Sequence, residues 1–321
     1  MKEDWFLNMD TIIQDAKFVK SPFGYFGSKH RLALRIAQQL PPHHAWVEAF
    51  CGSAAVTLSK PPAPIEVIND IDSELVNFFQ QLRDNTEQLC RAIELTPYAR
   101  QELLIARSVA RESLSSLERA RRFLISSMMA INGAFGEDSG GFSYSSSYAR
   151  GGMEARVNRW FNLPERLKGV VQRLRTVRIE NRDARELLKM FSVRPASLVY
   201  LDPPYLGKRS LGYARDANDK TFHAELLQLA CEAKCMVLIS GYDNALYSKI
   251  LRPKDGWSRV HISTHTRGSN GRSCKRVEVL WKNKHYRLAE EAKKVPILLS
   301  KKETREGKIN PPRKGNPKEP E

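Results

Sequence analysis

Short apolar segments rich in β-branched residues alternate along this chain with amphipathic segments of helical periodicity. The pattern predicts buried strands at 45–50 (AWVEAF), 65–69 (IEVIN), 177–181 (VRIEN), 197–202 (SLVYLD) and 236–242 (MVLISGY), and final strands at 258–265 and 277–282. Strands of this kind that alternate with helices favour a parallel sheet covered by helices on both faces. We therefore predict a doubly wound α/β domain with a mostly parallel sheet.

The alternation of strands and helices is interrupted between residues 86 and 175. This stretch begins with a long helical, arginine-rich pattern without strands and continues into a segment rich in Gly, Ser and Tyr. It predicts an inserted helical region, so that the sheet domain consists of residues 20–85 and 176–285. Over 286–321 the chain holds several prolines among Lys and Glu and has little apolar content, which predicts a disordered basic tail.

The charge balance indicates a polyanionic partner. The chain has 52 Lys and Arg against 36 Asp and Glu, a formal net charge of +16. A positive surplus concentrates polyanions, and neutralising phosphates releases their counterions. Nucleic acid is therefore the expected partner, ahead of an anionic membrane surface.

Cysteine usage and hydropathy exclude several other classes of protein. The five cysteines are scattered and odd in number, so we expect no disulfide framework. Cys231 and Cys235 lie four residues apart, but no second Cys/His pair with metal-ligand spacing accompanies them, so we expect no metal site. No apolar run approaches 18 residues and the N-terminus has no signal-peptide pattern. We expect a cytoplasmic protein without a membrane span.

The first candidate site lies at the end of the first predicted strand, in Glu48-Ala49-Phe50-Cys51-Gly52-Ser53. In doubly wound sheets, ligands bind beyond the carboxyl ends of the strands, at the tight turn into the next helix. Gly52 allows a ligand to approach the backbone closely, and Asp70, at the end of the next strand, can accept hydrogen bonds from ribose hydroxyls. With only one such glycine, the turn suits a nucleoside without a pyrophosphate. An ordinary strand-to-helix turn followed by a capping Asp remains the structural alternative.

The second candidate site is Asp202-Pro203-Pro204-Tyr205, which closes a strongly apolar strand. Two successive prolines hold a loop rigid, and neither has an N–H. The Asp202 carboxylate and a nearby carbonyl offer two acceptors for one NH2 group, and Tyr205 offers a ring on which a base can stack. A proline-rich turn without function is much less expected at this place.

These motifs together resemble the Dam-like class of adenine-N6 DNA methyltransferases, in which the cofactor motif precedes a recognition insertion and the DPPY motif follows it. The similarity runs over about residues 20–285. The segments that carry it are 22–29 (PFGYFGSK), 50–53 (FCGS), 69–70 (ND), 181–183 (NRD), 202–205 (DPPY), 237–240 (VLIS) and 278–281 (EVLW). The family's cofactor turn is usually F-x-G-x-G, whereas here Ala54 stands at the second glycine.

The resemblance implies a role for each matching residue. S-adenosylmethionine would be surrounded by Tyr25, Lys29, Phe50, Gly52, Asp70 and Asp183, with Asp70 on the ribose and Asp183 near the adenine ring of the cofactor. In the target site, Asp202 and the Pro203 carbonyl would accept from the amine, Pro204 would hold the loop rigid, and Tyr205 would stack on the flipped base. Methyl transfer would be an in-line displacement without a metal. Because the amine is unreachable inside duplex DNA, the base must be extruded.

The resemblance also implies a partner and leaves alternatives open. The substrate would be double-stranded DNA, recognised at a specific site through the insertion at 86–175, with Arg107 and Arg111 on phosphates and Asn132, Arg150 and Arg156 as candidates for base contacts. The enzyme could be phage-borne, an orphan, or paired with a separate restriction endonuclease. Cytosine-N4 methyltransferases share the chemistry but usually carry Ser in place of Asp202, and RNA or protein glutamine substrates usually go with Asn. A non-catalytic DNA-binding module that keeps the fold is a further alternative.

Overall fold

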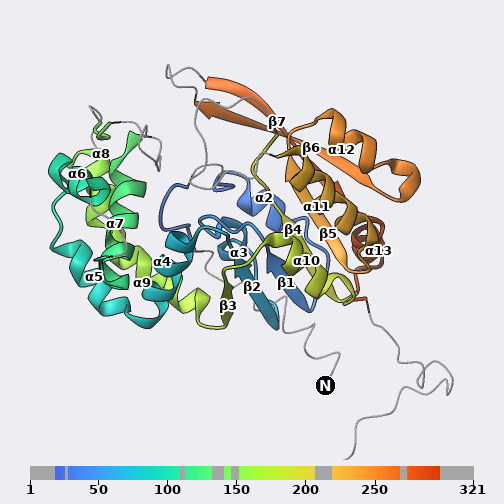
Figure 1. Cartoon of the computed structure of the whole chain (residues 1–321), viewed down its shortest axis with the longest axis horizontal. Coiled ribbons are helices and arrows are strands. Elements are labelled where there is room, and N and C mark those ends of the chain that lie inside the picture. Colours follow the sequence, from blue (N-terminus) through green and yellow to red (C-terminus); the bar gives the residue numbers. More distant parts are fainter. Residues whose placement is uncertain are drawn as a thin grey trace, which may run out of the picture.

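The structure is a computed structural model that describes residues 19–25, 28–108, 113–131, 141–145, 152–206, 219–267 and 273–296. Within these ranges, seven strands form one sheet in the order β3-β2-β1-β4-β5-β7-β6 (Figure 1). The strands are β1 (Ala45–Glu48), β2 (Ile65–Asn69), β3 (Val177–Glu180), β4 (Ser197–Leu201), β5 (Met236–Gly241), β6 (Ser258–Arg267) and β7 (Ser273–Lys282). Strands β1 to β5 pair in parallel, whereas β7 runs antiparallel between β5 and β6. The predicted doubly wound, mostly parallel α/β sheet is confirmed.

Two groups of helices cover the two faces of this sheet. They are α2 (Ala33–Ala37), α3 (Ala55–Leu58) and α13 (Lys284–Ala292) on one face, and α10 (Ala184–Ser192), α11 (Lys220–Glu232) and α12 (Ala245–Ile250) on the other. Successive strand residues point to opposite faces, so Trp46 and Tyr200 pack with the first group while Val47 and Val199 pack with the second. In the described ranges, no helix is long and apolar enough to cross a membrane.

The predicted interruption of the sheet is helical. Between β2 and β3 the chain forms α4 (Ser73–Asp84), α5 (Thr86–Glu94), α6 (Arg100–Ser108), α7 (Ser116–Met129), α8 (Ala155–Phe161) and α9 (Leu163–Leu174). Helices α5 to α9 gather beside β3, the edge strand (Figure 1). Their core is continuous with the rest of the fold, because Phe23 contacts both Phe78 of α4 and Phe123 of α7 at ring-centroid distances of 5.2 and 5.3 Å. The role of this segment as a separate recognition region stays a prediction.

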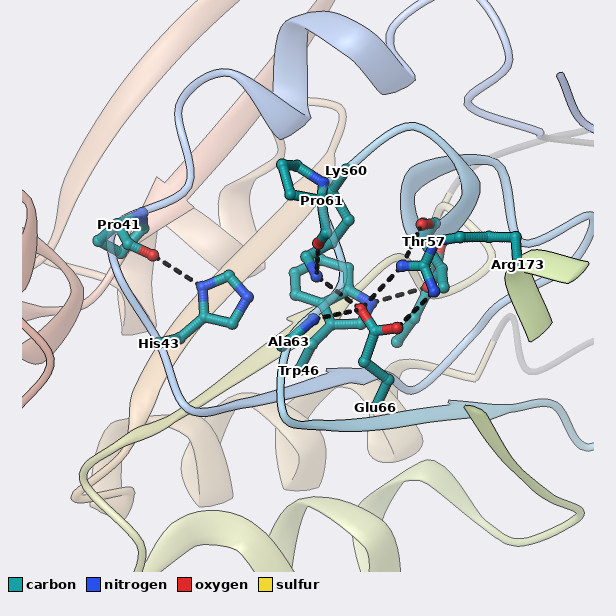
Figure 2. Close-up of polar contacts among 10 residues, drawn as sticks. Pro41, His43, Trp46, Thr57, Lys60, Pro61, Ala63, Glu66 and Arg173 are labelled. Atoms are coloured by element: carbon teal, nitrogen blue, oxygen red, sulfur yellow. Dashed lines mark hydrogen bonds and ion pairs between the residues drawn. The ribbon is translucent and has the colours of Figure 1, made fainter. Parts of the chain in front are cut away.

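A buried ion cluster at the start of β2 joins this helical segment to the sheet (Figure 2). The Glu66 carboxylate is 1% exposed and accepts from Lys60 Nζ at 2.7 Å and from Arg173 Nη1 of α9 at 2.5 Å. Arg173 also donates to the Thr57 carbonyl of α3 at 3.0 Å. Because removing one partner of a buried ion pair costs about 3–5 kcal/mol, this cluster holds α9, α3 and β2 together.

The C-terminal boundary of the fold lies further along the chain than the sequence predicted. Residues 286–292, assigned to a disordered tail, belong to helix α13, which Asn283 caps by accepting from the Tyr286 backbone N–H. Tyr286 is fully buried and Ala289 almost so, and the Tyr286 hydroxyl donates to the Gln39 carbonyl at 2.6 Å. Two buried residues among many charged ones are enough to dock this helix, which is why the composition misled. Residues 297–321 lie outside the described ranges.

We predict that two truncations affect the stability of the fold differently. A chain that ends at residue 296 keeps α13 and should unfold at the same temperature as the full chain. A chain that ends at residue 283 loses Tyr286 and should be less stable by about 3 kcal/mol or more, the typical cost of removing a buried aromatic side chain. Thermal and urea unfolding measure both. Equal stability of the two truncated chains would show that α13 contributes nothing to the fold.

Candidate active site

A cavity of about 290 Å³ opens beyond the carboxyl ends of β1 to β4. Strand β1 lies between β2 and β4, so the chain order reverses there, and such a switch point is where doubly wound sheets bind ligands. Each strand end contributes to the lining. The lining includes Tyr25, Ser28 and Lys29 before β1, Glu48, Phe50 and Gly52 after β1, Asn69, Asp70 and Asp72 after β2, Arg182 and Asp183 after β3, and Asp202 and Pro204 after β4.

The turn after β1 uses two left-handed residues. Gly52 has a φ of 47° and Ala54 a φ of 52°, so the residue at the family's second glycine adopts the conformation that glycine prefers. The methyl group of Ala54 is fully buried, and its packing offsets part of the cost of this conformation. The Gly52 N–H donates to Asp70 Oδ2 at 2.9 Å, which joins the ends of β1 and β2.

Three polar residues form the wall of the cavity beyond β2. Asp70 Oδ1 accepts from the Asp72 N–H at 3.1 Å, and Asp72 caps α4 and accepts from the Tyr25 hydroxyl at 3.1 Å. Burial is the main cause that raises the pKa of Asp70 to about 6, and hydrogen bonds from the Gly52 and Asp72 N–H groups partly oppose this rise. Burial also raises the pKa of Glu48, at the end of β1, to about 7. The cavity therefore holds carboxyl groups that titrate near neutral pH.

Asp183 and Phe50 line another part of the cavity wall. Asp183 caps α10 by accepting from the Arg185 N–H at 2.8 Å, and it forms an ion pair with the Arg185 side chain at 2.5 Å. These hydrogen bonds from Arg185 hold the pKa of Asp183 below its usual value. Phe50 meets Phe222 of α11 edge to face, with ring centroids 6.3 Å apart. All of the residues predicted to bind the cofactor thus line one cavity.

One oxygen of Asp202 receives three hydrogen bonds. Oδ1 accepts from Lys29 Nζ at 2.6 Å, from the Ser240 hydroxyl at 2.8 Å and from the Tyr205 hydroxyl at 3.2 Å. Oδ2 accepts none from the residues that the structure describes, and the side chain is 13% exposed at the cavity. These hydrogen bonds hold the carboxylate in one orientation at the cavity.

Lys29 lies between two carboxylates, a position that the sequence did not reveal. Besides Asp202, its ammonium contacts Glu278 Oε1 of β7 at 3.3 Å and lies 4.8 Å from the centre of the Tyr205 ring. Lys29 thus lines the cavity and also reaches the DPPY motif. Its expected role as a cofactor ligand stays a prediction, and the structure adds a role in orienting Asp202.

The remaining residues of the DPPY motif lie beside the cavity. Pro203 and Pro204 are buried, and Pro204 lines the cavity whereas Pro203 does not. The single proton of the Tyr205 hydroxyl is shared between Asp202 Oδ1 and the closer Glu278 Oε1, and the ring meets Tyr242 edge to face with centroids 4.6 Å apart. The Lys29 ammonium lies over the Tyr205 ring, so a base that stacks on this face of the ring would share it with the ammonium.

Sequence reasoning named the segments of Ser240 and Glu278 only as parts of the resemblance and gave neither residue a role. Glu278 is 4% exposed although it stands in an alternating strand pattern, Val277-Glu278-Val279, that is usually read as a polar outer face. The available signal in the sequence was an acidic residue, Glu278, followed by strongly apolar neighbours such as Leu280 and Trp281. Among the described residues, no group of three or more His, Cys, Asp or Glu is placed to hold a metal ion.

Three arginines of α7, within the segment expected to recognise DNA, have partners within the protein. Arg119 pairs with Glu74 at 2.5 Å, and Arg121 and Arg122 both pair with Glu118, at 2.7 and 2.6 Å. These three arginines support the packing of α7 and are not free for phosphates. Arg107 lies on α6, whereas Arg111, Asn132 and Arg150 lie outside the described residues.

Alanine substitutions at two glycines should have opposite effects on stability. At Gly52 a Cβ atom would lie 3.0 Å from Tyr25 Cδ1 and the left-handed backbone would be strained, so Gly52→Ala should destabilise the protein by about 1–2 kcal/mol. At Gly169, inside α9, the nearest atom would be Val19 Cγ1 at 3.9 Å, so Gly169→Ala should stabilise by about 0.5–1 kcal/mol. Urea unfolding measures both. A stabilising Gly52→Ala would mean that the turn is not constrained as described.

Comparisons with known proteins agree with this site. The family described as D12 class N6 adenine-specific DNA methyltransferase matches residues 25–260. The chain is 28% identical over 207 residues to the Type II methyltransferase M1.LlaDCHI of Lactococcus lactis subsp. cremoris, covering 61% of this chain and 69% of that protein.

Two solved structures are similar only at a low level. One is a SAM-dependent methyltransferase from Agrobacterium tumefaciens, with a TM-score of 0.34, 9% identity, and coverage of 79% of this chain and 59% of that chain. The other is precorrin 8w decarboxylase from Methanobacterium thermoautotrophicum, with a TM-score of 0.31, 9% identity, and coverage of 79% and 87%. We base no assignment of fold or function on similarity at this level.

The family match extends over most of the chain and includes the cofactor turn, the helical segment and the DPPY motif. The resemblance to adenine-N6 methyltransferases drawn from the motifs is thereby confirmed. This chain belongs to the D12 class of N6 adenine-specific DNA methyltransferases.

Proposed function

We propose that this DNA methyltransferase acts on the exocyclic N6 amine of an adenine flipped out of duplex DNA, with Asp202 as the acceptor of the amine hydrogens. The observation that carries the proposal is the orientation of Asp202. Three donors contact Oδ1, whereas Oδ2 accepts no hydrogen bond from the residues that the structure describes, and Asp202 lines the cavity. An aromatic amine is a poor nucleophile, because its lone pair is delocalised into the ring. A carboxylate that accepts its hydrogens draws the nitrogen towards tetrahedral geometry and stabilises the charge that develops there.

Family membership supports S-adenosylmethionine as the methyl donor, and the residues of the cavity fit such a ligand. At Gly52 there is no Cβ to keep a ligand from the backbone, two carboxylates can accept from hydroxyl or amino groups, and Phe50 offers an apolar surface. We assign the cofactor contacts to Tyr25, Lys29, Phe50, Gly52, Asp70 and Asp183. The bound cofactor supplies an electrophilic methyl group. The protein's own contribution is to orient the two ligands and to exclude water.

Asp202 also favours adenine over cytosine as the target base. Cytosine-N4 enzymes with the same chemistry usually have Ser at this position. Here the carboxylate is followed by two buried prolines that fix the loop, and the Pro203 carbonyl is proposed as the second acceptor for the same amine. Tyr205 is proposed to stack on the extruded base.

The test is methylation of mixed-sequence DNA, followed by sequencing that detects modified bases. The wild-type enzyme should modify adenines in a defined sequence context. Asp202→Asn should lower the methyl-transfer rate by about 100-fold or more, the typical loss on removing a group that stabilises transition-state charge. Cofactor affinity should change by no more than a few-fold. Asp255→Asn, an exposed carboxylate in an ion pair with Arg252, is the control and should keep the wild-type rate. Modified cytosines, or a rate near wild type for Asp202→Asn, would contradict the proposal.

Asp70 predicts a pH dependence of cofactor binding. An ionised carboxylate accepts from a ribose hydroxyl more strongly than a protonated carboxyl group does, and burial raises the pKa of Asp70 from 3.8 to about 6. Affinity should therefore be full above about pH 7 and fall as the pH drops through about 6, by about tenfold per pH unit at most. Calorimetric titrations over this range measure the effect. Asp70→Asn should weaken binding and flatten the profile, and an unchanged profile would remove Asp70 from the ribose site.

Protonation of Asp70, which should weaken cofactor binding, should instead increase the stability of the ligand-free protein. Because the folded state raises the pKa, the protonated carboxyl favours folding. This contribution is complete below about pH 3.8 and is lost as the pH rises through about 6.

We propose that DNA phosphates bind where α8 and α9 meet the N-terminal segment. Arg166 donates to the carbonyls of Ser21 and Pro22 at 2.9 and 2.7 Å, and Arg159 Nη2 lies 4.0 Å from the position of a Cβ at Gly24. Burial and the neighbouring Arg156 lower the pKa of Arg159. Unlike the arginines of α7, these have no carboxylate at ion-pair distance among the described residues. The same N-terminal segment continues into Tyr25 and Lys29, so phosphates bound here would lie near the cavity.

Salt dependence of DNA binding tests these arginines. Arg156→Gln with Arg159→Gln should weaken binding and reduce the slope of log K against log salt by about two, since each phosphate contact contributes about 0.9. Arg83→Gln with Arg91→Gln removes the same charge from exposed positions on α4 and α5 and is the control. If both pairs lower the slope equally, net charge and not this site explains the binding.

The insertion at 86–175 remains our proposal for sequence recognition, and a separate restriction endonuclease remains a possible partner. Phosphate contacts position a protein, whereas base contacts specify the site. Substitutions in the insertion that change which adenines are modified would support this division.

A further inference from the structure

Glu278 is a buried carboxylate that no role assigned so far explains. It lies in β7, opposite Ile262 of β6, and its side chain is only 5% exposed. Burying an ionised carboxylate is costly unless it is paired and hydrogen-bonded. Its described partners are the Tyr205 hydroxyl, which donates to Oε1, and the Lys29 ammonium, which lies 3.3 Å from the same oxygen. Both partners belong to the methyl-transfer site.

The contacts of Glu278 and Asp202 form a closed arrangement. Lys29 and Tyr205 each contact both carboxylates, and each reaches Asp202 at the same oxygen, Oδ1. The third donor to Oδ1, Ser240, is held independently by the Tyr200 hydroxyl at 2.9 Å. Two of the three donors that orient Asp202 are therefore placed by Glu278.

Removing the Glu278 charge would change the surroundings of Asp202. The Lys29 ammonium would lose one of its two carboxylate partners and would be drawn further onto Asp202, where it can reach both oxygens. An uncharged acceptor at this position would hold the Tyr205 hydroxyl more weakly, so this hydroxyl would also be drawn towards Asp202. Either movement would bring a protein donor to Oδ2, the oxygen that the target amine needs.

We propose that Glu278 is a positioning residue of the methyl-transfer site, which holds Lys29 and Tyr205 on Oδ1 of Asp202 and so keeps Oδ2 open for the target amine. Glu278 acts through these two residues and does not line the cavity. The inference rests on the proposed role of Asp202. It extends that role to β7, which lies in the antiparallel part of the sheet.

The test compares Glu278→Gln with the wild-type enzyme on DNA whose target adenine has been identified by sequencing. Glutamine keeps the size of the side chain and can still accept from Tyr205, but it loses the charge that pairs with Lys29. Single-turnover methylation should slow at least tenfold, while cofactor affinity changes less than threefold. Fluorescence of 2-aminopurine at the target position, measured without cofactor, should still rise on binding, because base flipping does not need Oδ2.

The matched control is Glu290→Gln. Glu290 also pairs with a buried lysine, Lys282 at 2.7 Å, but it lies on α13 away from the site. The Glu290→Gln variant should keep the wild-type rate of methylation. Thermal unfolding of the Glu278→Gln and Glu290→Gln variants measures any general loss of stability. A rate for Glu278→Gln within twofold of wild type would overturn the inference, as would a loss of rate no larger than the loss of folded protein.

Glu278→Asp provides a second measurement if the glutamine variant does not fold. It keeps the charge one methylene further from Lys29 and should restore at least a third of the wild-type rate. An aspartate variant that is folded but as slow as Asp202→Asn would show that charge at this position is not what matters, and would overturn the inference. If the wild-type enzyme itself methylates no adenine, the proposed function fails instead, and the two failures are distinct.

Discussion

The balance of charge around Glu66 is the constraint on which the arrangement of this protein depends. Its carboxylate is buried at the start of β2 and would be strongly destabilising without Lys60 and Arg173. Arg173 belongs to the last turn of α9, directly before β3, so the pairing fixes where the helical segment returns to the sheet. Arg173 also holds the carbonyl of Thr57, whose N–H and hydroxyl both donate to Glu48 at the cavity. Packing of the helical segment and geometry of the cavity are thus parts of one polar network.

The proposed active site is divided by the switch point of the sheet. The turn after β1 and the ends of β2 and β3 provide the proposed cofactor contacts, while β4, β5 and β7 provide Asp202 and the groups that orient it. Lys29 precedes all of these strands and lies at the boundary, lining the cavity and contacting both carboxylates of the other half. In the family's motif order this lysine belongs to the N-terminal cofactor segment. Its contacts with Asp202 and Glu278 place its positive charge beside the proposed acceptor of the target amine.

Local sequence patterns predicted most of the fold and the residues of the cavity, because strand periodicity and strand-end motifs depend on near neighbours. They predicted less well what depends on distant contacts. Tyr286 and Ala289 dock a helix that composition assigned to a disordered tail, and this docking depends on contacts with residues far away in the sequence, such as Gln39. Glu118 and Glu74 neutralise arginines that looked available to DNA. Ala54 shows the same limit, since its left-handed backbone is stabilised by burial that the motif alone does not show.

The position of Glu278 within antiparallel β7 constrains it differently from the other residues of the proposed site. Gly52, Asp70, Asp183 and Asp202 follow the ends of parallel strands, where loops can lengthen or bend without disturbing the sheet. Glu278 lies within a strand whose register is fixed on both sides, with Val279 opposite both Gly241 and His261. A shift of register by one residue would turn its side chain to the other face of the sheet. Insertions and deletions can therefore reshape the substrate loops during evolution, whereas the hairpin of β6 and β7 can change only by substitution.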